Sequence, residues 1–108
     1  MDELNPQPEG LTVDVTTEAD DVVLITVTGD IDIATVERIR SAVARATALH
    51  AKGLVVDLSG VKFMDSSGIA VLIEARTCVP AIALRRPSPP VQRLLITTGL
   101  TGILPEEP

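Results

Sequence analysis

Short aliphatic runs alternate with segments of helical periodicity along this chain, and this order restricts the possible folds more than any other feature. Leu11 to Thr17 alternates apolar and polar residues, and Val22 to Thr28 is a second β-branched run that follows a polar turn. Two such runs so close together predict an antiparallel hairpin. Leu54 to Leu58 is almost continuously apolar, which is typical of a strand buried on both faces of a sheet. Pro80 to Leu84 predicts one further short strand.

The segments between and after these strands predict helices. Apolar residues recur at helical spacing from Val36 to Leu49, and Asp32 is the expected N-cap of this helix. A second helix is expected from Asp65 to Arg76, and a third from Val91 to Thr98, ended by Gly99. The order β-β-α-β-α-β-α predicts an α/β fold. It would hold a mixed sheet of four to five strands, an N-terminal antiparallel hairpin and about three to four packed helices.

The domain limits follow from the breaks in this pattern. Residues 1–10 contain prolines, a glycine and acidic residues, so we expect a flexible N-terminal tail, a folded domain at 11–104 and a C-terminal tail at 105–108. Ser59 and Gly60 are expected to break the strand that contains Leu54 to Leu58. The segment Arg85 to Pro90 is too rich in proline for either a helix or a strand.

Composition excludes several classes of function. The chain has 108 residues, enough for one core, and that core must be aliphatic, with Phe63 as its only aromatic residue. Without Trp or Tyr, the chain lacks the stacking platforms that bind single-stranded nucleic acid. The net charge of -6 also disfavours nucleic acid, because that binding depends on basic residues that neutralise phosphates.

The cysteine content and the length of the apolar runs indicate the cellular compartment in which the protein is expected. The single Cys78 cannot form an internal disulfide and, together with the lone His50, provides no ligand set for zinc. We therefore expect a reducing, cytoplasmic environment. The longest apolar run, Ile69 to Ile73, is too short to span a bilayer, and no leader segment is evident, so no membrane association is expected.

The segment from Asp57 to Ile69 holds the residues with the most chemical information. Its expected layout is a strand, a short excursion, and two serines at the start of a helix. That position places unpaired backbone N–H groups and the positive end of the helix dipole beside Ser66 and Ser67. One interpretation is structural, with Ser66 only capping the helix. Another is that Ser67 is chemically modified, and the two are compatible.

A hydrolytic enzyme is a competing interpretation of the same serines. A serine at a strand-to-helix turn is also typical of hydrolase nucleophiles, but the G-x-S-x-G spacing is absent and the only histidine, His50, is expected at the far end of the first helix. Asp30 and Asp32 are more typical of a cap and a solvated charge than of acid–base chemistry. We expect no catalytic residues, no cofactor and no metal site.

The chain resembles the STAS domain of bacterial anti-sigma factor antagonists over nearly its whole length, from Leu11 to Leu104. The resemblance rests on DLSGVKFMDSSGI at 57–69, GDID at 29–32 and PPVQRLLITTGL at 89–100. It implies the STAS fold and a non-enzymatic role in a stress-response pathway of partner switching. In that role, the unphosphorylated protein binds an anti-sigma factor and releases a sigma factor.

The resemblance also implies roles for individual residues. Ser67 would be phosphorylated by a cognate anti-sigma factor serine kinase, and a serine phosphatase would restore the active form. Asp30 and Asp32 would lie near the phosphoserine and the partner. The partner-binding residues implied in this way are Asp30, Asp32, Asp65, Ser66, Ser67, Gly68 and Ile69, of which Ile69 could equally belong to the core.

Three alternatives remain open at this point. The domain could serve another assembly, such as a regulator of a phosphatase or kinase, or a lipid-transport complex. It could bind a nucleotide or anion at the start of the second helix. It could also be a divergent relative whose serines only cap that helix. The chain is also a few residues shorter than the usual pattern between Ile73 and Leu84, which affects the expected length of the second helix.

Overall fold

The computed structural model describes residues 10–18 and 20–107, so most of the expected N-terminal tail lies outside the described residues. Four strands and three helices follow one another in this part of the chain, which confirms the α/β fold and the predicted element order. The elements are β1 (Leu11–Thr17), β2 (Val22–Ile31), α1 (Val36–Ala48), β3 (Gly53–Met64), α2 (Ser66–Ala75), β4 (Ala81–Arg85) and α3 (Pro89–Thr98).

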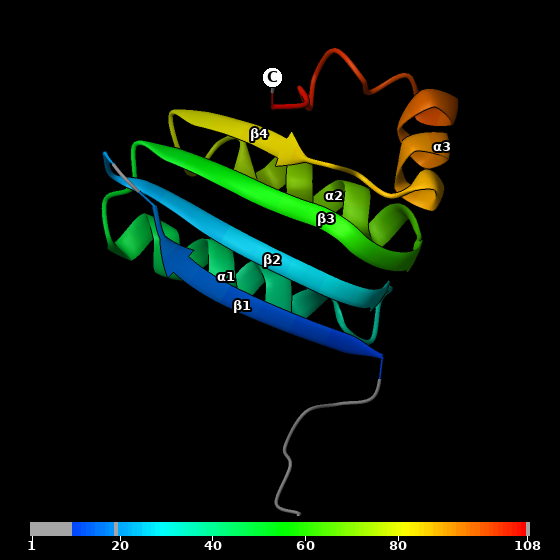
Figure 1. The fold of residues 1–108 in the computed structure, drawn as a ribbon, viewed down its shortest axis with the longest axis horizontal. Helices are drawn as coiled ribbons and strands as arrows, with labels where there is room; N and C mark the ends of the chain where they lie inside the picture. The colour runs from blue at the N-terminus through cyan, green and yellow to red at the C-terminus, as the bar shows by residue number, and fades with distance from the viewer. Residues whose placement is uncertain (1–9, 19, 108) are drawn as a thin grey trace, which may run out of the picture.

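The strands form one mixed sheet in the order β1-β2-β3-β4. β1 and β2 are antiparallel, which confirms the predicted hairpin, whereas β2, β3 and β4 are parallel. Figure 1 shows α1 and α2 behind this sheet and α3 at one end of it. In the part of the chain that the structure describes, no helix covers the face of the sheet that is turned toward the viewer.

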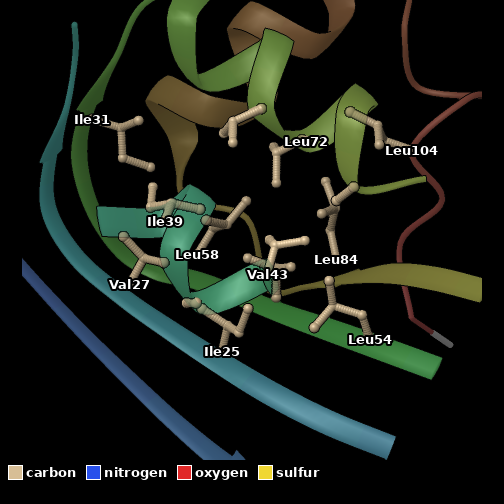
Figure 2. Packing of buried hydrophobic residues seen from close by; sticks show 14 of the residues in the cluster. Ile25, Val27, Ile31, Ile39, Val43, Leu54, Leu58, Leu72, Leu84 and Leu104 are labelled. Carbon is tan, nitrogen blue, oxygen red and sulfur yellow. The ribbon is translucent and has the colours of Figure 1, made fainter. Parts of the chain in front are cut away.

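The hydrophobic core lies between the sheet and the helices. Alternate residues of β2 and β3, such as Ile25, Val27 and Leu58, point toward α1 and α2 and are fully buried. Figure 2 shows these side chains packed against Ile39 and Leu72 from the helices. All members of the described core are aliphatic residues or methionine, so the low aromatic content of the sequence does not prevent a continuous core.

Phe63 does not belong to this core, contrary to the sequence-based expectation. Its side chain is 50% exposed, whereas Met64 beside it is buried. Successive residues of a strand point to opposite faces of the sheet. Because Met64 faces the helices, Phe63 faces the side that no described helix covers.

The predicted break in β3 at Ser59 and Gly60 is also wrong. The strand continues to Met64, and Gly60 pairs with Thr28 of β2. The register between β2 and β3 shifts at two places there, between Thr26 and Thr28 and between Gly29 and Asp30. A bulged strand accommodates glycine without ending, and the sequence alone does not distinguish a bulge from a break.

The proline-rich segment Arg85 to Pro90 is more ordered than predicted. Arg85 completes β4, Ser88 is the extended N-cap residue of α3, and Pro89 is its first helical residue. Proline is favoured at this position because the first N–H groups of a helix have no intrahelical partner. The predicted end of α3 at Gly99 is confirmed, and Gly99 has the left-handed conformation of a C-cap, with φ of +74°.

An ion pair between a buried carboxylate and an exposed arginine fixes the connection between β4 and α3. Asp57 is only 5% exposed and accepts hydrogen bonds from the backbone N and Oγ of Ser59, at 2.9 and 2.7 Å, and from Nη2 of Arg86 at 2.8 Å. Burial raises the pKa of Asp57, but these hydrogen bonds together outweigh it and hold the pKa below its ordinary value. The carboxylate therefore stays charged and ties Arg86 to β3.

Gly29 allows the first two strands to come into close contact. Its φ is +109°, and a Cβ atom at this position would lie only 1.9 Å from the carbonyl oxygen of Gly10. We expect Gly29→Ala to lower the free energy of unfolding by about 2 kcal/mol or more, because the new methyl group adds both strain and a backbone clash. Urea denaturation followed by circular dichroism measures this.

Gly102→Ala is the matched control, since a Cβ atom there has no neighbour within 4 Å. Its unfolding free energy should stay within about 0.5 kcal/mol of the parent protein. Equal stabilities of the Gly29 and Gly102 variants would contradict the described contact between Gly29 and Gly10.

Candidate functional site

Two turns meet at the edge of the sheet where β2 and β3 end. The last residues of these parallel strands, Ile31 and Met64, are register partners. The backbone N of Asp65 then donates to the carbonyl oxygen of Ile31 at 3.1 Å. The turn after β2 and the start of α2 therefore lie side by side, which brings the aspartates at 30 and 32 near the DSSG segment.

Asp65 is the N-cap of α2, and it binds Ser67 twice. Its backbone is extended, with φ of -109° and ψ of -170°. Its Oδ1 accepts from the backbone N of Ser67 at 2.9 Å and from the Ser67 hydroxyl at 2.5 Å. The interpretation that Ser66 caps the helix is therefore wrong, because the adjacent carboxylate already occupies that role. Ser66 is the first helical residue, and its side chain is exposed.

Ser67 is half-buried at the positive end of the α2 dipole. His50, the only histidine, follows the C-terminus of α1, whereas this site lies beside the N-terminus of that helix. A 13-residue helix is roughly 20 Å long at 1.5 Å per residue, which places His50 out of reach of Ser67 as a general base. The hydroxyl donates to a carboxylate at a helix N-terminus, where the helix dipole attracts an added anion and the carboxylate repels it.

Asp32 organises the turn before α1. The prediction that Asp32 is the N-cap of α1 is wrong. Its Oδ1 accepts from the backbone N of Ala34 and of Thr35, at 2.9 and 3.1 Å. Thr35 is the N-cap residue, and its hydroxyl donates to the carbonyl oxygen of Asp30 at 2.9 Å. The Asp32 side chain closes a turn that delays the helix by three residues, and so the cap lies later than the sequence pattern indicated.

Asp30 is fixed through its backbone. Its N donates to the carbonyl oxygen of Gly10 at 2.5 Å, and its register partner on β3 is Phe63. Among residues 10–18 and 20–107, no group of three or more His, Cys, Asp or Glu side chains is arranged to hold a metal ion.

Gly68 and Ile69 face the interior. A Cβ atom on Gly68 would lie 2.6 Å from Cγ of Met64 and 2.8 Å from Cγ2 of Ile31. Ile69 is only 7% exposed and belongs to the core cluster, the second of the two positions that the sequence left open for it. These two residues hold the first turn of α2 tightly against β2 and β3, and so they determine where Ser67 sits.

Two apolar residues that were not predicted to belong to the site are exposed at this edge. Ile33, in the turn after β2, is 79% exposed, and Phe63, near the end of β3, is 50% exposed. Strand alternation does not indicate Phe63, because Val61, two residues earlier, is buried, and the register between β2 and β3 shifts between the partners of these two residues. No local pattern indicated the exposure of Ile33.

Comparisons with known proteins identify relatives of the whole domain. The model of the STAS domain family matches residues 15–107. An anti-sigma factor antagonist from Mycobacterium paratuberculosis has 28% sequence identity and a TM-score of 0.83, over 94% of this chain and 89% of that chain. An anti-sigma-factor antagonist (STAS) domain protein from Planctomyces limnophilus has 25% identity and a TM-score of 0.73, over 88% of this chain and 87% of that one.

The Bacillus cell fate determinant SpoIIAA, in its phosphorylated form, has 22% identity and a TM-score of 0.69, over 90% of this chain and 92% of that chain. At this identity the likeness concerns the fold. Within the described residues, none of the helices has the length and apolar character needed to cross a membrane.

The Asp65 cap generates a prediction about stability. We expect Asp65→Ala to lower the free energy of unfolding by about 1 kcal/mol, because the N–H of Ser67 loses its acceptor. Asp65→Asn should stay within a few tenths of a kcal/mol of the parent, since an amide oxygen also caps a helix. Urea denaturation of both variants is the measurement.

Ser66→Ala serves as the control and should change stability by less than about 0.5 kcal/mol, because its side chain is exposed and does not cap the helix. A larger loss for Ser66→Ala than for Asp65→Ala would reverse the assignment of the cap.

Proposed function

Because this chain belongs to the STAS domain family, we propose that it is a non-enzymatic anti-sigma factor antagonist that phosphorylation of Ser67 switches off. In its unphosphorylated form it would bind an anti-sigma factor serine kinase, so that a sigma factor is released. A serine phosphatase would return the phosphorylated form to the binding state. The observation that carries the proposal is the position of Ser67, with its hydroxyl bound to the capping carboxylate at the start of α2.

The likeness to the mycobacterial anti-sigma factor antagonist supports this role, because it extends over 94% of this chain. The surface around Ser67 supports it as well. Ile33 and Phe63 are exposed at the same edge of the sheet, close to the aspartates of the two turns. Exposed aromatic and aliphatic side chains surrounded by polar groups are typical of protein interfaces.

Phosphorylation would change the chemistry of this surface locally. The kinase would transfer the γ-phosphoryl group of ATP to Oγ of Ser67, with ADP as the leaving group, and the hydroxyl proton would pass to solvent or to a base of the kinase. The hydrogen bond from Ser67 to Asp65 would then disappear, because its donor hydrogen is gone. A phosphoserine carries roughly -1.5 to -2 charges at neutral pH. Two unit charges about 4 Å apart near a protein surface repel by roughly 4 kcal/mol before salt screening.

The helix N-terminus offsets part of this repulsion. An anion there gains about 0.3 to 1 kcal/mol from the helix dipole, and so the fold should tolerate the modification. At an interface fitted to a neutral hydroxyl the situation differs, because an unpaired buried anion costs several kcal/mol. The proposed switch therefore acts on partner binding much more than on folding.

The direct test is phosphorylation of the purified protein. We expect incubation with a cognate anti-sigma factor serine kinase and ATP to add one phosphate, which tandem mass spectrometry should locate on Ser67. Ser67→Ala should accept no phosphate, because the acceptor hydroxyl is absent.

Ser66→Ala is the matched control, since it removes the neighbouring hydroxyl and leaves the Asp65–Ser67 contact in place. It should be phosphorylated at a rate within a few-fold of the parent protein. Phosphate on Ser66, or equal loss of phosphorylation in the two variants, would overturn the assignment to Ser67.

A second prediction concerns binding of the unphosphorylated protein to the same kinase. Ser67→Ala should bind within a few-fold of the parent, because alanine remains uncharged. Ser67→Asp should bind at least a hundredfold more weakly, which corresponds to about 2.7 kcal/mol, because it brings an anion to the interface. Isothermal titration calorimetry measures both. Equal affinities for the alanine and aspartate variants would contradict a switch based on charge.

A further inference from the structure

The outer edge of β4 is occupied for part of its length by the C-terminal residues. The backbone N of Leu84 donates to the carbonyl oxygen of Pro105 at 2.8 Å, and the N of Glu107 donates to the carbonyl oxygen of Leu84 at 2.7 Å. Glu106 and Leu84 thereby form a parallel bridge. Residues 105–107, which the sequence assigned to a C-terminal tail, therefore extend the sheet by a short segment beside β4.

An arginine holds this acidic segment in place. The carboxylate of Glu107 accepts from Nε and Nη2 of Arg85, at 2.6 and 2.9 Å, and these hydrogen bonds lower the pKa of Glu107. The edge of β4 thus binds an extended acidic segment through backbone pairing and a carboxylate–arginine contact. Glu106, the bridge residue between the two contacts, is exposed.

Ile82, two residues before Leu84 on β4, offers a second edge position, and this one is free. Backbone groups of alternate strand residues point to the same side, so the N–H and C=O of Ile82 point outward as those of Leu84 do. Within the described part of the chain, neither group of Ile82 has a hydrogen-bonding partner on this edge. Pro80, two residues before Ile82, has no N–H, and Leu84 is already paired. The free edge is therefore one strand position long.

A pocket of about 320 Å³ lies against this free position. Val79 and Ile103 provide apolar walls, and Ile103 is 39% exposed. Arg76, at the C-terminal end of α2, lies on the rim and forms no ion pair with any residue in 10–18 or 20–107. The pocket therefore combines an unpaired backbone donor and acceptor, an apolar wall and an unpaired cation.

We propose that this pocket binds a short extended peptide segment of a partner protein that carries an acidic residue beside an apolar one. The backbone of the segment would pair with the N–H and C=O of Ile82 and add a second short piece of strand to the β4 edge. Its apolar side chain would lie between Val79 and Ile103, and its carboxylate would bind Arg76. The C-terminal residues of this chain already use the neighbouring position in this way, with Glu107 on Arg85.

The length and charge of the site favour a short peptide over a second copy of this chain. Pairing of two sheets edge to edge needs several consecutive free residues, whereas Pro80 and the paired Leu84 limit this edge to Ile82. A second copy would also bring a net charge of -6, whereas a short peptide brings one carboxylate, which Arg76 can pair locally. The site is on β4 and α2, away from Ser67, and so the proposal does not rest on the phosphorylation switch.

The test is a titration of the ¹⁵N-labelled full chain with the N-acetylated, C-amidated dipeptide Ile-Glu, followed by two-dimensional NMR. The amide signals of Ile82 and Ile103 should move in a saturable way, whereas those of Leu84 and Glu107 should stay in place. The Glu→Gln version of the peptide should bind roughly two- to fivefold more weakly, as expected for one exposed ion pair.

Variants of the protein test the role of Arg76. In Arg76→Gln the glutamate and glutamine peptides should bind equally, whereas Arg93→Gln on α3 should retain the difference, because that exposed arginine is not part of the pocket. The proposal is overturned by equal binding of the two peptides to the parent protein or by signal changes confined to β1. It is also overturned by displacement of Glu107, or by movement of the Ile82 signal with protein concentration alone, which would identify a second copy as the occupant.

Discussion

The parallel pairing of β2 with β3 is the constraint on which the candidate site depends. Parallel strands end at the same edge of a sheet, so the residues after Ile31 and Met64 must lie side by side. A single backbone hydrogen bond from Asp65 to Ile31 continues this pairing into the two turns. Residues more than thirty positions apart in the sequence thereby form one surface.

The same geometry gives Asp65 two roles that oppose each other. In the unmodified protein it caps α2 and accepts from the hydroxyl of Ser67. A phosphate on Ser67 would turn this attraction into repulsion between anions while the helix N-terminus still attracts both. A carboxylate at the cap therefore makes the site sensitive to added charge in a way that an uncharged serine or threonine cap would not.

Much of this arrangement could be predicted from the sequence, because aliphatic periodicity is a direct consequence of burial. The hairpin, the three helices and the position of Ser67 at a helix start follow from such patterns. Local patterns failed where tertiary pairing decides the outcome. Gly60 lies within a strand because β2 pairs with it, and the α1 cap moved from Asp32 to Thr35 because a side chain closed an additional turn. The exposure of Phe63 depends on which face the helices cover, and no short segment encodes that.

The packing beneath Ser67 limits how a modification there can act. Gly68 has no room for even one more carbon atom against Met64 and Ile31, and Ile69 is part of the core. Displacing the first turn of α2 would therefore disturb a close-packed interior, which costs more than the few kcal/mol that surface charges supply. A charge added at Ser67 would consequently remain a property of the surface, and the proposed partner would have to respond to it.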